Sequence, residues 1–321
     1  MLKRPPFPLV FNESLRTAFV SCPRAAFWEY FHHFKHPSPN VHLHAGKAWA
    51  SALETARMAY YGPDKASAQD AQALGLVTLI TEYADFQAPE RGSGAAKSLD
   101  RLIEAFSYYF LAFPLESDPV QPHYGRDGKP MVEFNFALPI ANDLLHPETL
   151  EPILFAGRAD MVATYAGALS IYDDKTTGQL GQSWANQWNR RSQFSAYSWA
   201  AREYGIPVSQ VVVRGIAILK TSINHAQAIT VRTPHHIEEW HKQIQRDIRR
   251  AIDCWKEGYF DVNLSDACSS YGGCMFQQAC MSNNPDPWLE GGFVRRIFDP
   301  VTRTETLIPK ESPNGQSLPN G

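Results

Sequence analysis

The chain has 321 residues, of which 44% are hydrophobic and 20% are charged, a composition typical of a soluble globular protein. No apolar run approaches the roughly 20 residues that cross a bilayer, and the N-terminal MLKRPPFPLV lacks the apolar core of a signal peptide, so we expect a cytoplasmic protein. A formal net charge of −3 excludes a globally basic protein, so positive charge for binding nucleic acid has to be concentrated locally.

The first third of the chain is predicted to be helical. Amphipathic and alanine-rich patterns indicate helices at residues 14–34, 46–61, about 68–85 and 99–111. Breaks rich in proline, glycine and serine separate them, among them KHPSPN and APERGSGAAKS.

The pattern then changes to strands. Strands are predicted in KPMVEFNFALPI, PILFAGRADMVATYAG and ALSIYDD, and the short turn YAGAL between the last two favours a hairpin. A helix over 184–204, a fourth strand in VSQVVVRGIAIL and a charged helix over 234–256 follow. Helices flanking a mixed sheet form an α/β layered architecture.

Acidic side chains stand where two predicted strands meet. Strand alternation puts Asp173 and Lys175 on one face, and a hairpin would bring Asp160 of GRAD beside Asp173. Two carboxylates so close repel each other unless a cation neutralises them. Mg²⁺ prefers such oxygen ligands and can stabilise a phosphodiester transition state, while Lys175 could hold the attacking water or the phosphate. An isolated D-x-K is more often a polar strand end in which the lysine pairs with an aspartate.

The following helix carries a second polar pair. Gln193 and Tyr197 are four residues apart and therefore share a helical face. Both can hydrogen-bond a phosphate or a metal-bound water. By itself, such a pair is more often an ordinary surface feature.

The chain has five cysteines, and an odd number argues against a disulfide framework. Cys268, Cys274 and Cys280 crowd together at spacings that differ from the C-x-x-C of common zinc modules. A site with four thiolates needs a further cysteine, for which Cys22 and Cys254 are the candidates. Cys254 lies in a helical stretch, where a buried structural thiol is usual.

GRAD, IYDDKT and a helix with Q-x-x-x-Y together resemble the PD-(D/E)XK nuclease superfamily in its RecB-like branch. The resemblance spans residues 15–285, including SCPRAAFWEY and the C-terminal cysteines, and is greatest to phage exonuclease-like and CRISPR-associated RecB-type nucleases. It implies a restriction-endonuclease-like α/β fold, a mixed β-sheet core flanked by helices, with an N-terminal helical elaboration and a C-terminal cysteine cluster. It also implies that Asp160 and Asp173 bind the metal, that Lys175 is the catalytic lysine, and that Gln193 and Tyr197 stand beside them.

The resemblance further implies a use for the cysteines. In RecB-like nucleases with an iron–sulfur cluster, one N-terminal cysteine joins three C-terminal ones, a pattern that Cys22, Cys268, Cys274 and Cys280 match. Four thiolates can hold a [4Fe–4S] cluster, which here would close a loop of nearly the whole chain and act structurally. Zinc in the same positions and free thiols are the alternatives.

One position departs from the RecB-like pattern, in which an early helix carries a metal-binding histidine. Trp49 stands near the expected position, and Glu54 follows a turn and a half later. Glu54 is a candidate metal ligand, directly or through water, and equally a solvated helix residue. Weaker candidates are His42, His44 and Glu133.

The predicted organisation has four parts. Residues 1–125 form a helical region packed on the core, and residues 126–260 form the nuclease core. Residues 261–298 form a cysteine region that closes back on Cys22, and residues 299–321 form a flexible polar tail.

Candidate contacts to nucleic acid are local clusters. Basic side chains that could neutralise phosphates, or simply form a solvated surface, are Arg158, Arg190, Arg191, Arg246, Arg249 and Arg250. Trp184 and Trp188 could stack on bases, but we interpret them as core. Because nothing in the sequence reads base identity, we expect sequence-independent cutting.

We therefore expect a Mg²⁺- or Mn²⁺-dependent deoxyribonuclease, an exonuclease in recombination, repair or phage DNA processing. It would act on linear ends or single strands in the cytoplasm of a bacterium or a phage-infected host, with a recombination protein as a candidate partner. Alternatives are a non-catalytic DNA-binding iron–sulfur relative in a larger recombination complex, a purely structural iron–sulfur module, and a nuclease acting on RNA or nucleotides.

Overall fold

The computed structural model describes residues 3–38, 40–84, 86–264, 266–269 and 273–308. The chain divides into two compact units. The first comprises residues 1–38, 136–157 and 239–321, and the second comprises residues 39–135 and 158–238. The chain passes between them within β4 (Val132–Pro139), β5 (Leu154–Tyr165) and α8 (Pro234–Glu257).

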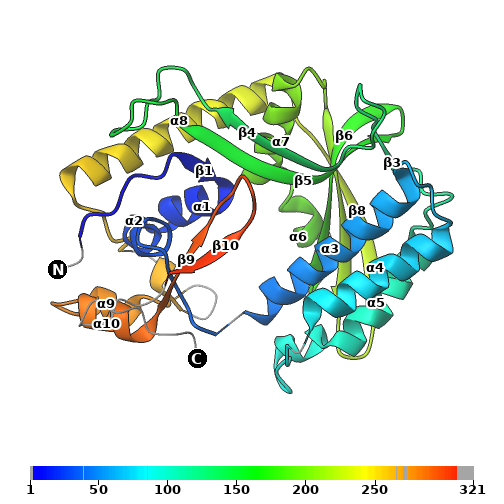
Figure 1. Ribbon diagram of the computed structural model, residues 1–321, viewed down its shortest axis with the longest axis horizontal. Helices are drawn as coiled ribbons and strands as arrows, with labels where there is room; N and C mark the ends of the chain where they lie inside the picture. Colours follow the sequence, from blue (N-terminus) through cyan, green and yellow to red (C-terminus); the bar gives the residue numbers. More distant parts are fainter. Residues whose placement is uncertain (1–2, 39, 85, 265, 270–272, 309–321) are drawn as a thin grey trace. The chain divides into compact units, whose positions relative to one another are not determined.

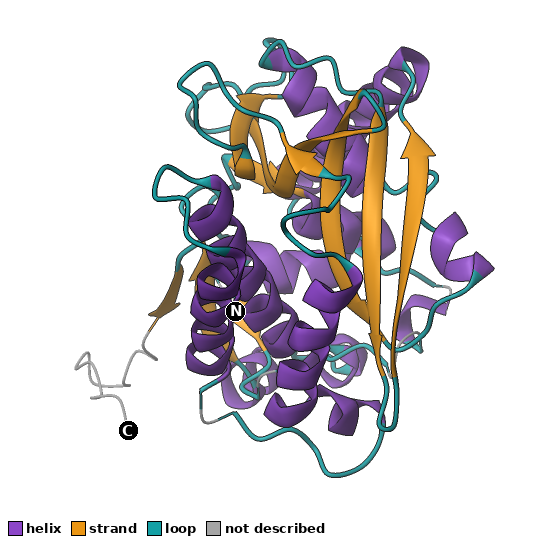
Figure 2. Ribbon diagram, turned by 90° about the vertical axis from the view of Figure 1, so that its right-hand side faces the viewer, coloured by secondary structure: helices purple, strands orange, loops and turns teal. Residues whose placement is uncertain are grey.

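The second unit is built on a mixed sheet. Its strands β5, β6 (Ala168–Thr177), β7 (Gln210–Ile218) and β8 (Ile223–Val231) are hydrogen-bonded in that order. Figure 2 shows the long strands of the sheet side by side in orange. Strands β5 and β6 pair antiparallel, β6 and β7 parallel, and β7 and β8 antiparallel. The short β3 (Gln121–Pro122) and β4 pair with β5. The predicted mixed α/β fold is confirmed.

The predicted hairpin is the connection between β5 and β6. Its two central residues, Ala166 and Gly167, both have positive φ, at 49° and 77°. A two-residue turn of this kind matches the twist of the flanking strands and holds them in a fixed register. The hairpin therefore determines which side chains of β5 and β6 face each other.

Three long helices cover one face of this sheet. They are α3 (Val41–Tyr61), α4 (Ala68–Tyr83) and α5 (Leu99–Ala112), which lie side by side in blue and cyan in Figure 1. A short 3₁₀ turn, η2 (Ser93–Lys97), precedes α5. Helix α3 begins at Val41, five residues before the predicted start, because the Asn40 side chain caps it by accepting hydrogen bonds from the backbone of His42 and Leu43. Their shared core includes Trp49, Leu53, Phe106 and Ile216.

The other face carries α6 (Gln182–Asn186) and α7 (Ser192–Glu203). The prediction of one helix over 184–204 was wrong. Buried Arg232 donates a hydrogen bond to the backbone carbonyl of Trp188 at 2.7 Å, between the two helices. In a continuous helix the Trp188 carbonyl would accept a hydrogen bond from a backbone N–H four residues later, whereas here it accepts one from the Arg232 side chain.

Strand β8 is absent from the prediction. Its buried residues include Ala228 and Thr230, whereas Ile229 and Val231 are exposed. Because two of its large apolar side chains face solvent and a threonine is buried, the strand lacks the hydrophobic alternation that marks a half-buried strand.

The first unit begins with β1 (Val10–Asn12), which pairs parallel with the start of β5. Helices α1 (Glu13–Ser21) and α2 (Pro23–Ala26) and a π-helical turn, η1 (Phe27–Phe31), follow. The predicted single helix over 14–34 was wrong, because it is broken at Cys22, whose φ and ψ of −158° and 106° are extended. The residue before a proline is disfavoured in helical conformation, and Pro23 follows directly.

The C-terminal part of the first unit is made of short elements. They are η3 (Asp266–Cys268), α9 (Gln277–Met281), α10 (Asp286–Gly292), β9 (Val294–Phe298) and β10 (Glu305–Ile308). Strand β9 pairs with β10 and with β2 (Phe34–Lys35) in a three-stranded antiparallel sheet. In the tail expected to be flexible, β10 is ordered by this pairing, and residues 309–321 lie outside the described residues.

None of the helices in the described part of the chain combines the length and apolar composition that a membrane-spanning helix requires.

Replacing Gly75 of α4 should destabilise the second unit. A Cβ there would lie 2.7 Å from the carbonyl oxygen of Ala52 and 2.7 Å from the Phe106 ring. We expect Gly75→Ala to lower the free energy of unfolding by about 1–3 kcal/mol, measured by urea denaturation.

Gly46→Ala is the matched control. A Cβ at Gly46 of α3 meets no atom within 4 Å, so the substitution should stabilise the helix by about 0.5–1 kcal/mol. Equal stability of the two variants would contradict the close packing at Gly75.

Candidate active site and cysteine cavity

The β5–β6 hairpin brings Asp160 and Asp173 together. The pairing of β5 with β6 ends at Met161 and Tyr172, and Asp160 and Asp173 are the next residues on the two strands. The backbone N–H of Asp174 donates to Asp160 Oδ2 at 2.8 Å. Asp173 is only 1% exposed.

Burial and neighbouring charges raise the pKa values of both carboxyls. Burial, together with the nearby Asp160 carboxylate, raises the pKa of Asp173 to about 8, although Lys175 opposes the rise. Burial likewise raises the pKa of Asp160, with Lys175 opposing and Asp174 adding to the rise. A negative pair held in this way favours a cation between the carboxylates.

Lys175 is the ammonium group of this cluster. Its Nζ forms an ion pair with Asp173 Oδ2 on the same face of β6. Burial lowers the pKa of Lys175, but the Asp173 and Asp160 carboxylates raise it by more, so the amine stays charged. The predicted arrangement of two carboxylates and one ammonium group is present.

The predicted polar pair on the helix also forms. Gln193 Nε2 donates to the Tyr197 hydroxyl at 2.7 Å on α7, which packs against β6. Both polar groups therefore act as one unit. Their role toward phosphate or water stays a prediction.

Glu54 lies in a different ion-pair group. Arg158, two residues before Asp160 on β5, pairs with Glu54 at 3.6 Å and also with Glu133 of β4. The Glu54 side chain is 37% exposed, and its predicted role as a metal ligand stays a prediction. Trp49 is buried and packs edge-to-face on Phe106 and Tyr109.

Among the residues that the structure describes, no three His, Cys, Asp or Glu side chains form a ready metal-binding group. Asp160 and Asp173 provide two carboxylates, and the remaining positions of an ion's shell would be left to water or substrate oxygens, as Mg²⁺ usually prefers.

The sequence did not reveal the partner of Asp174. Its carboxylate pairs at 2.5 Å with Arg57 of α3, and both side chains are buried. Arg57 follows Trp49 and Leu53 at intervals of four, inside the apolar stripe of the helix. An arginine within such a stripe was the sequence signal that could have predicted a buried acidic partner for Arg57.

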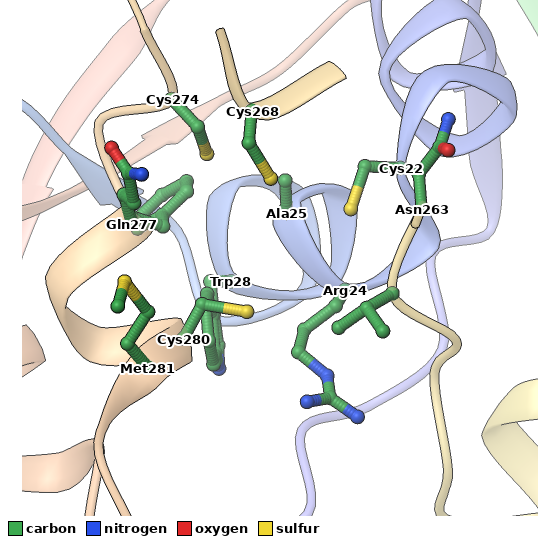
Figure 3. A pocket seen from close by; sticks show the side chains of 12 residues that line it. Cys22, Arg24, Ala25, Trp28, Asn263, Cys268, Cys274, Gln277, Cys280 and Met281 are labelled. Carbon is green, nitrogen blue, oxygen red and sulfur yellow. The ribbon is translucent and has the colours of Figure 1, made fainter. Parts of the chain in front are cut away.

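Four cysteines of the first unit surround one cavity. Cys22, Cys268, Cys274 and Cys280 line a space of about 150 Å³, into which Figure 3 shows their side chains directed. Burial raises the pKa of Cys274, and the neighbouring Cys22, Cys268 and Cys280 sulfurs raise it too. Apolar side chains such as Ala25 and Trp28 complete the lining.

Cys254 stands apart from this cavity. It is buried on α8, and burial raises the pKa of its thiol. All five thiols are free of disulfides. Of the two candidates for the fourth cysteine, the structure thus brings Cys22, and not Cys254, to the other three.

The candidate DNA-contacting residues differ in how exposed they are: the tryptophans are buried and the arginines named below are exposed. Trp184 and Trp188 are buried, as interpreted, and Trp184 packs against Gly215 of β7. Arg190 and Arg191 are exposed before α7. On α8, Arg249 and Arg250 form exposed ion pairs with Asp143 and Asp261.

Comparison with known proteins identifies the family. The model of the PD-(D/E)XK nuclease superfamily matches residues 14–281. The chain belongs to this superfamily of nucleases. The match includes Asp160, Asp173 and Lys175 and reaches the cysteines up to Cys280.

Two solved structures are similar at low identity. A Eubacterium rectale protein described as a candidate exonuclease shares 12% identity and a TM-score of 0.44, over 81% of this chain and 87% of that chain. The protein SSO0001 shares 12% identity and a TM-score of 0.35, over 88% of each chain. These scores add nothing to the family assignment. No curated protein matches the sequence.

Removing one carboxylate of this nuclease should stabilise the metal-free protein. Because the folded pKa of Asp173 is raised, its carboxyl favours folding below about pH 4 and loses that contribution as the pH rises toward about 8. In EDTA at pH 8, Asp173→Asn should raise the free energy of unfolding, measured by urea denaturation, because the amide carries no negative charge in this buried position beside Asp160.

Glu90→Gln, which removes an exposed loop charge, should leave that free energy unchanged. A loss of stability in Asp173→Asn would mean that the Lys175 ion pair outweighs the repulsion between carboxylates.

Proposed function

We propose that this nuclease is a metal-dependent deoxyribonuclease that hydrolyses phosphodiester bonds without strong sequence preference. An exonuclease acting in recombination, repair or phage DNA processing fits best. The observation that carries the proposal is the grouping of Asp160, Asp173 and Lys175 on one face of the hairpin.

The residues suit phosphodiester hydrolysis. Asp160 and Asp173 would hold one or two Mg²⁺ or Mn²⁺ ions. Such an ion, when bound, supplies Lewis acidity to the phosphate and lowers the pKa of an attacking water. Water attacks phosphorus and gives up a proton, the bond from phosphorus to the leaving oxygen breaks, and that oxygen takes up a proton, so that one water is added across the bond.

The other side chains have positioning roles in this proposal. The Lys175 ammonium would orient the water or stabilise charge on the phosphate. The hydrogen-bonded Gln193 and Tyr197 pair would hold the substrate or its hydration shell. Arg190 and Arg191, exposed just before α7, could neutralise backbone phosphates.

We also propose that the four-cysteine cavity holds a [4Fe–4S] cluster. Its donor set fits, since four thiolates are the usual ligands of such a cluster. The cluster would act structurally by joining Cys22 to Cys268, Cys274 and Cys280 within the first unit.

Activity tests the nuclease proposal. Labelled linear, circular and single-stranded DNA, with an RNA strand for comparison, are incubated with Mn²⁺ or with EDTA. We expect Mn²⁺-dependent cutting of linear DNA, which Lys175→Ala lowers by roughly 10²- to 10³-fold because the transition state loses its ammonium group.

The exposed Lys220→Ala is the control and should cut as the wild type does. Wild-type protein that binds DNA without cutting it would instead be a non-catalytic relative. Preferential cutting of RNA would reassign the substrate.

Metal content tests the cluster. Protein purified without oxygen should be brown and carry roughly four iron atoms per chain, as a [4Fe–4S] cluster requires. Cys280→Ser should lose the iron and the visible absorbance and should melt at a lower temperature, because the cross-link is lost.

Cys254→Ser is the matched control, since Cys254 is buried away from the cavity, and it should retain the iron. Stoichiometric zinc without iron in the wild type would contradict the cluster.

A further inference from the structure

Asp174 lies between Asp173 and Lys175 on β6. Its backbone contacts the carboxylate cluster, whereas its side chain does not. Its N–H donates to Asp160 Oδ2 at 2.8 Å. One of the two oxygens of Asp160 is therefore oriented by the peptide group between Asp173 and Asp174. Any shift or rotation of that peptide would move the Asp160 carboxylate.

The Asp174 side chain points to the opposite face, where it is held from three directions. Arg57 Nη2 pairs with Oδ2 at 2.5 Å, while the hydroxyls of Tyr109 and Tyr172 donate to Oδ1 at 3.0 and 2.8 Å. Exposure is 7% for the Arg57 side chain and 3% for that of Asp174. Both carboxylate oxygens thus have partners in a region shielded from water.

Arg57 closes this network. The same Nη2 lies 2.8 Å from the Tyr109 hydroxyl and 3.1 Å from the Tyr172 hydroxyl, and these hydroxyls are 2.9 Å apart. Burial lowers the pKa of Arg57, but the Asp174 carboxylate and the two tyrosines raise it by more. A buried network whose members are all satisfied holds one arrangement rigidly.

A second arginine braces the neighbouring strand. Arg214 of β7 is in register with Asp174, and its guanidinium makes two hydrogen bonds of 2.5 Å to Asp118. The same guanidinium lies 3.9 Å from the centre of the Phe113 ring and 5.3 Å from that of Tyr172. The strand that carries Asp174 is therefore confined on this face by two fixed cations.

Fold stability alone accounts poorly for this arrangement. Replacing a buried ion pair by well-packed apolar residues is often neutral or stabilising, so such pairs are best explained where they fix a register. Arg57 is one helical turn after Glu54 on α3. The Arg57–Asp174 link thus fixes how α3, with Glu54, is placed along β6.

From these contacts we propose that Asp174 and Arg57 are positioning residues of the metal centre: their link aligns Asp160 through the Asp174 N–H and sets α3 against β6. The inference rests on the proposed function, because it assumes that Asp160 and Asp173 bind a divalent ion. It predicts that metal affinity depends on side chains that never touch the metal.

The experiment measures Mn²⁺ affinity by calorimetric titration of the full chain, well below the melting temperature of every variant. Asp174→Asn and Arg57→Met should bind Mn²⁺ roughly 10- to 100-fold more weakly, the usual effect of losing an outer-sphere partner. Arg57→Lys keeps the charge without the planar fork and should recover part of the affinity.

Two further variants separate positioning from lost stability. Leu79→Ala removes a buried side chain of the same helical core and should lower stability while leaving Mn²⁺ affinity unchanged. Tyr109→Phe removes a single hydroxyl from Asp174 and should weaken Mn²⁺ binding in the same direction with little loss of fold, so a failure of Arg57→Met to fold does not end the test.

The outcomes are distinct. If the wild type binds Mn²⁺ and Asp174→Asn, Arg57→Met and Tyr109→Phe bind it equally well, the positioning role is overturned and the nuclease proposal stands. An equal loss of affinity in Leu79→Ala would also overturn it, since lost stability would then explain the effect. Absence of Mn²⁺ binding by the wild type would overturn both proposals.

Discussion

The approach of Asp160 to Asp173 is unfavourable by itself, and the neighbouring groups of the second unit offset it. Both carboxyls have raised pKa values, first because they are buried. Lys175 supplies one positive charge against the two negative ones. The tight turn and the backbone pairs up to Met161 and Tyr172 bring the two carboxyls together just beyond the paired part of the hairpin.

Strand alternation separates two charge clusters that would otherwise interfere. Asp173 and Lys175 face one side of β6, and Asp174 faces the other, where Arg57 neutralises it. The three consecutive charged residues at the end of β6 thus belong to two separate clusters, one on each face of the strand. The link between the clusters is a peptide group, the Asp174 N–H, which binds the Asp160 carboxylate.

The cysteine cavity lies in the first unit. This unit is assembled from segments far apart in sequence, and its C-terminal part consists of short helices and a small sheet. Short elements bury little apolar surface, as the small core around Trp28, Phe276 and Leu289 shows. A cross-link between Cys22 and the C-terminal cysteines would restrict the unfolded chain over a very long loop. The extended Cys22, fixed by Pro23, leaves the helix at the position where its thiol meets the other three.

The sequence by itself determined the fold class, the β5–β6 hairpin and the residues of the carboxylate cluster. These features are local: alternation, a two-residue turn and an apolar run ending in IYDDKT need no distant partner to be recognised. The choice of Cys22 as the fourth thiol came from a family resemblance, and spacing alone left Cys254 open. Tertiary structure decided the break between α6 and α7, where Arg232 binds a carbonyl, and the edge strand β8, in which Ile229 and Val231 face outward. It also decided the partners of Asp174 and Glu54, since Arg57 and Arg158 are far from them in sequence. Ion pairs of this kind depend on how helices and strands pack against each other. Sequence periodicity does not indicate that packing, so these partners could not be predicted from the sequence.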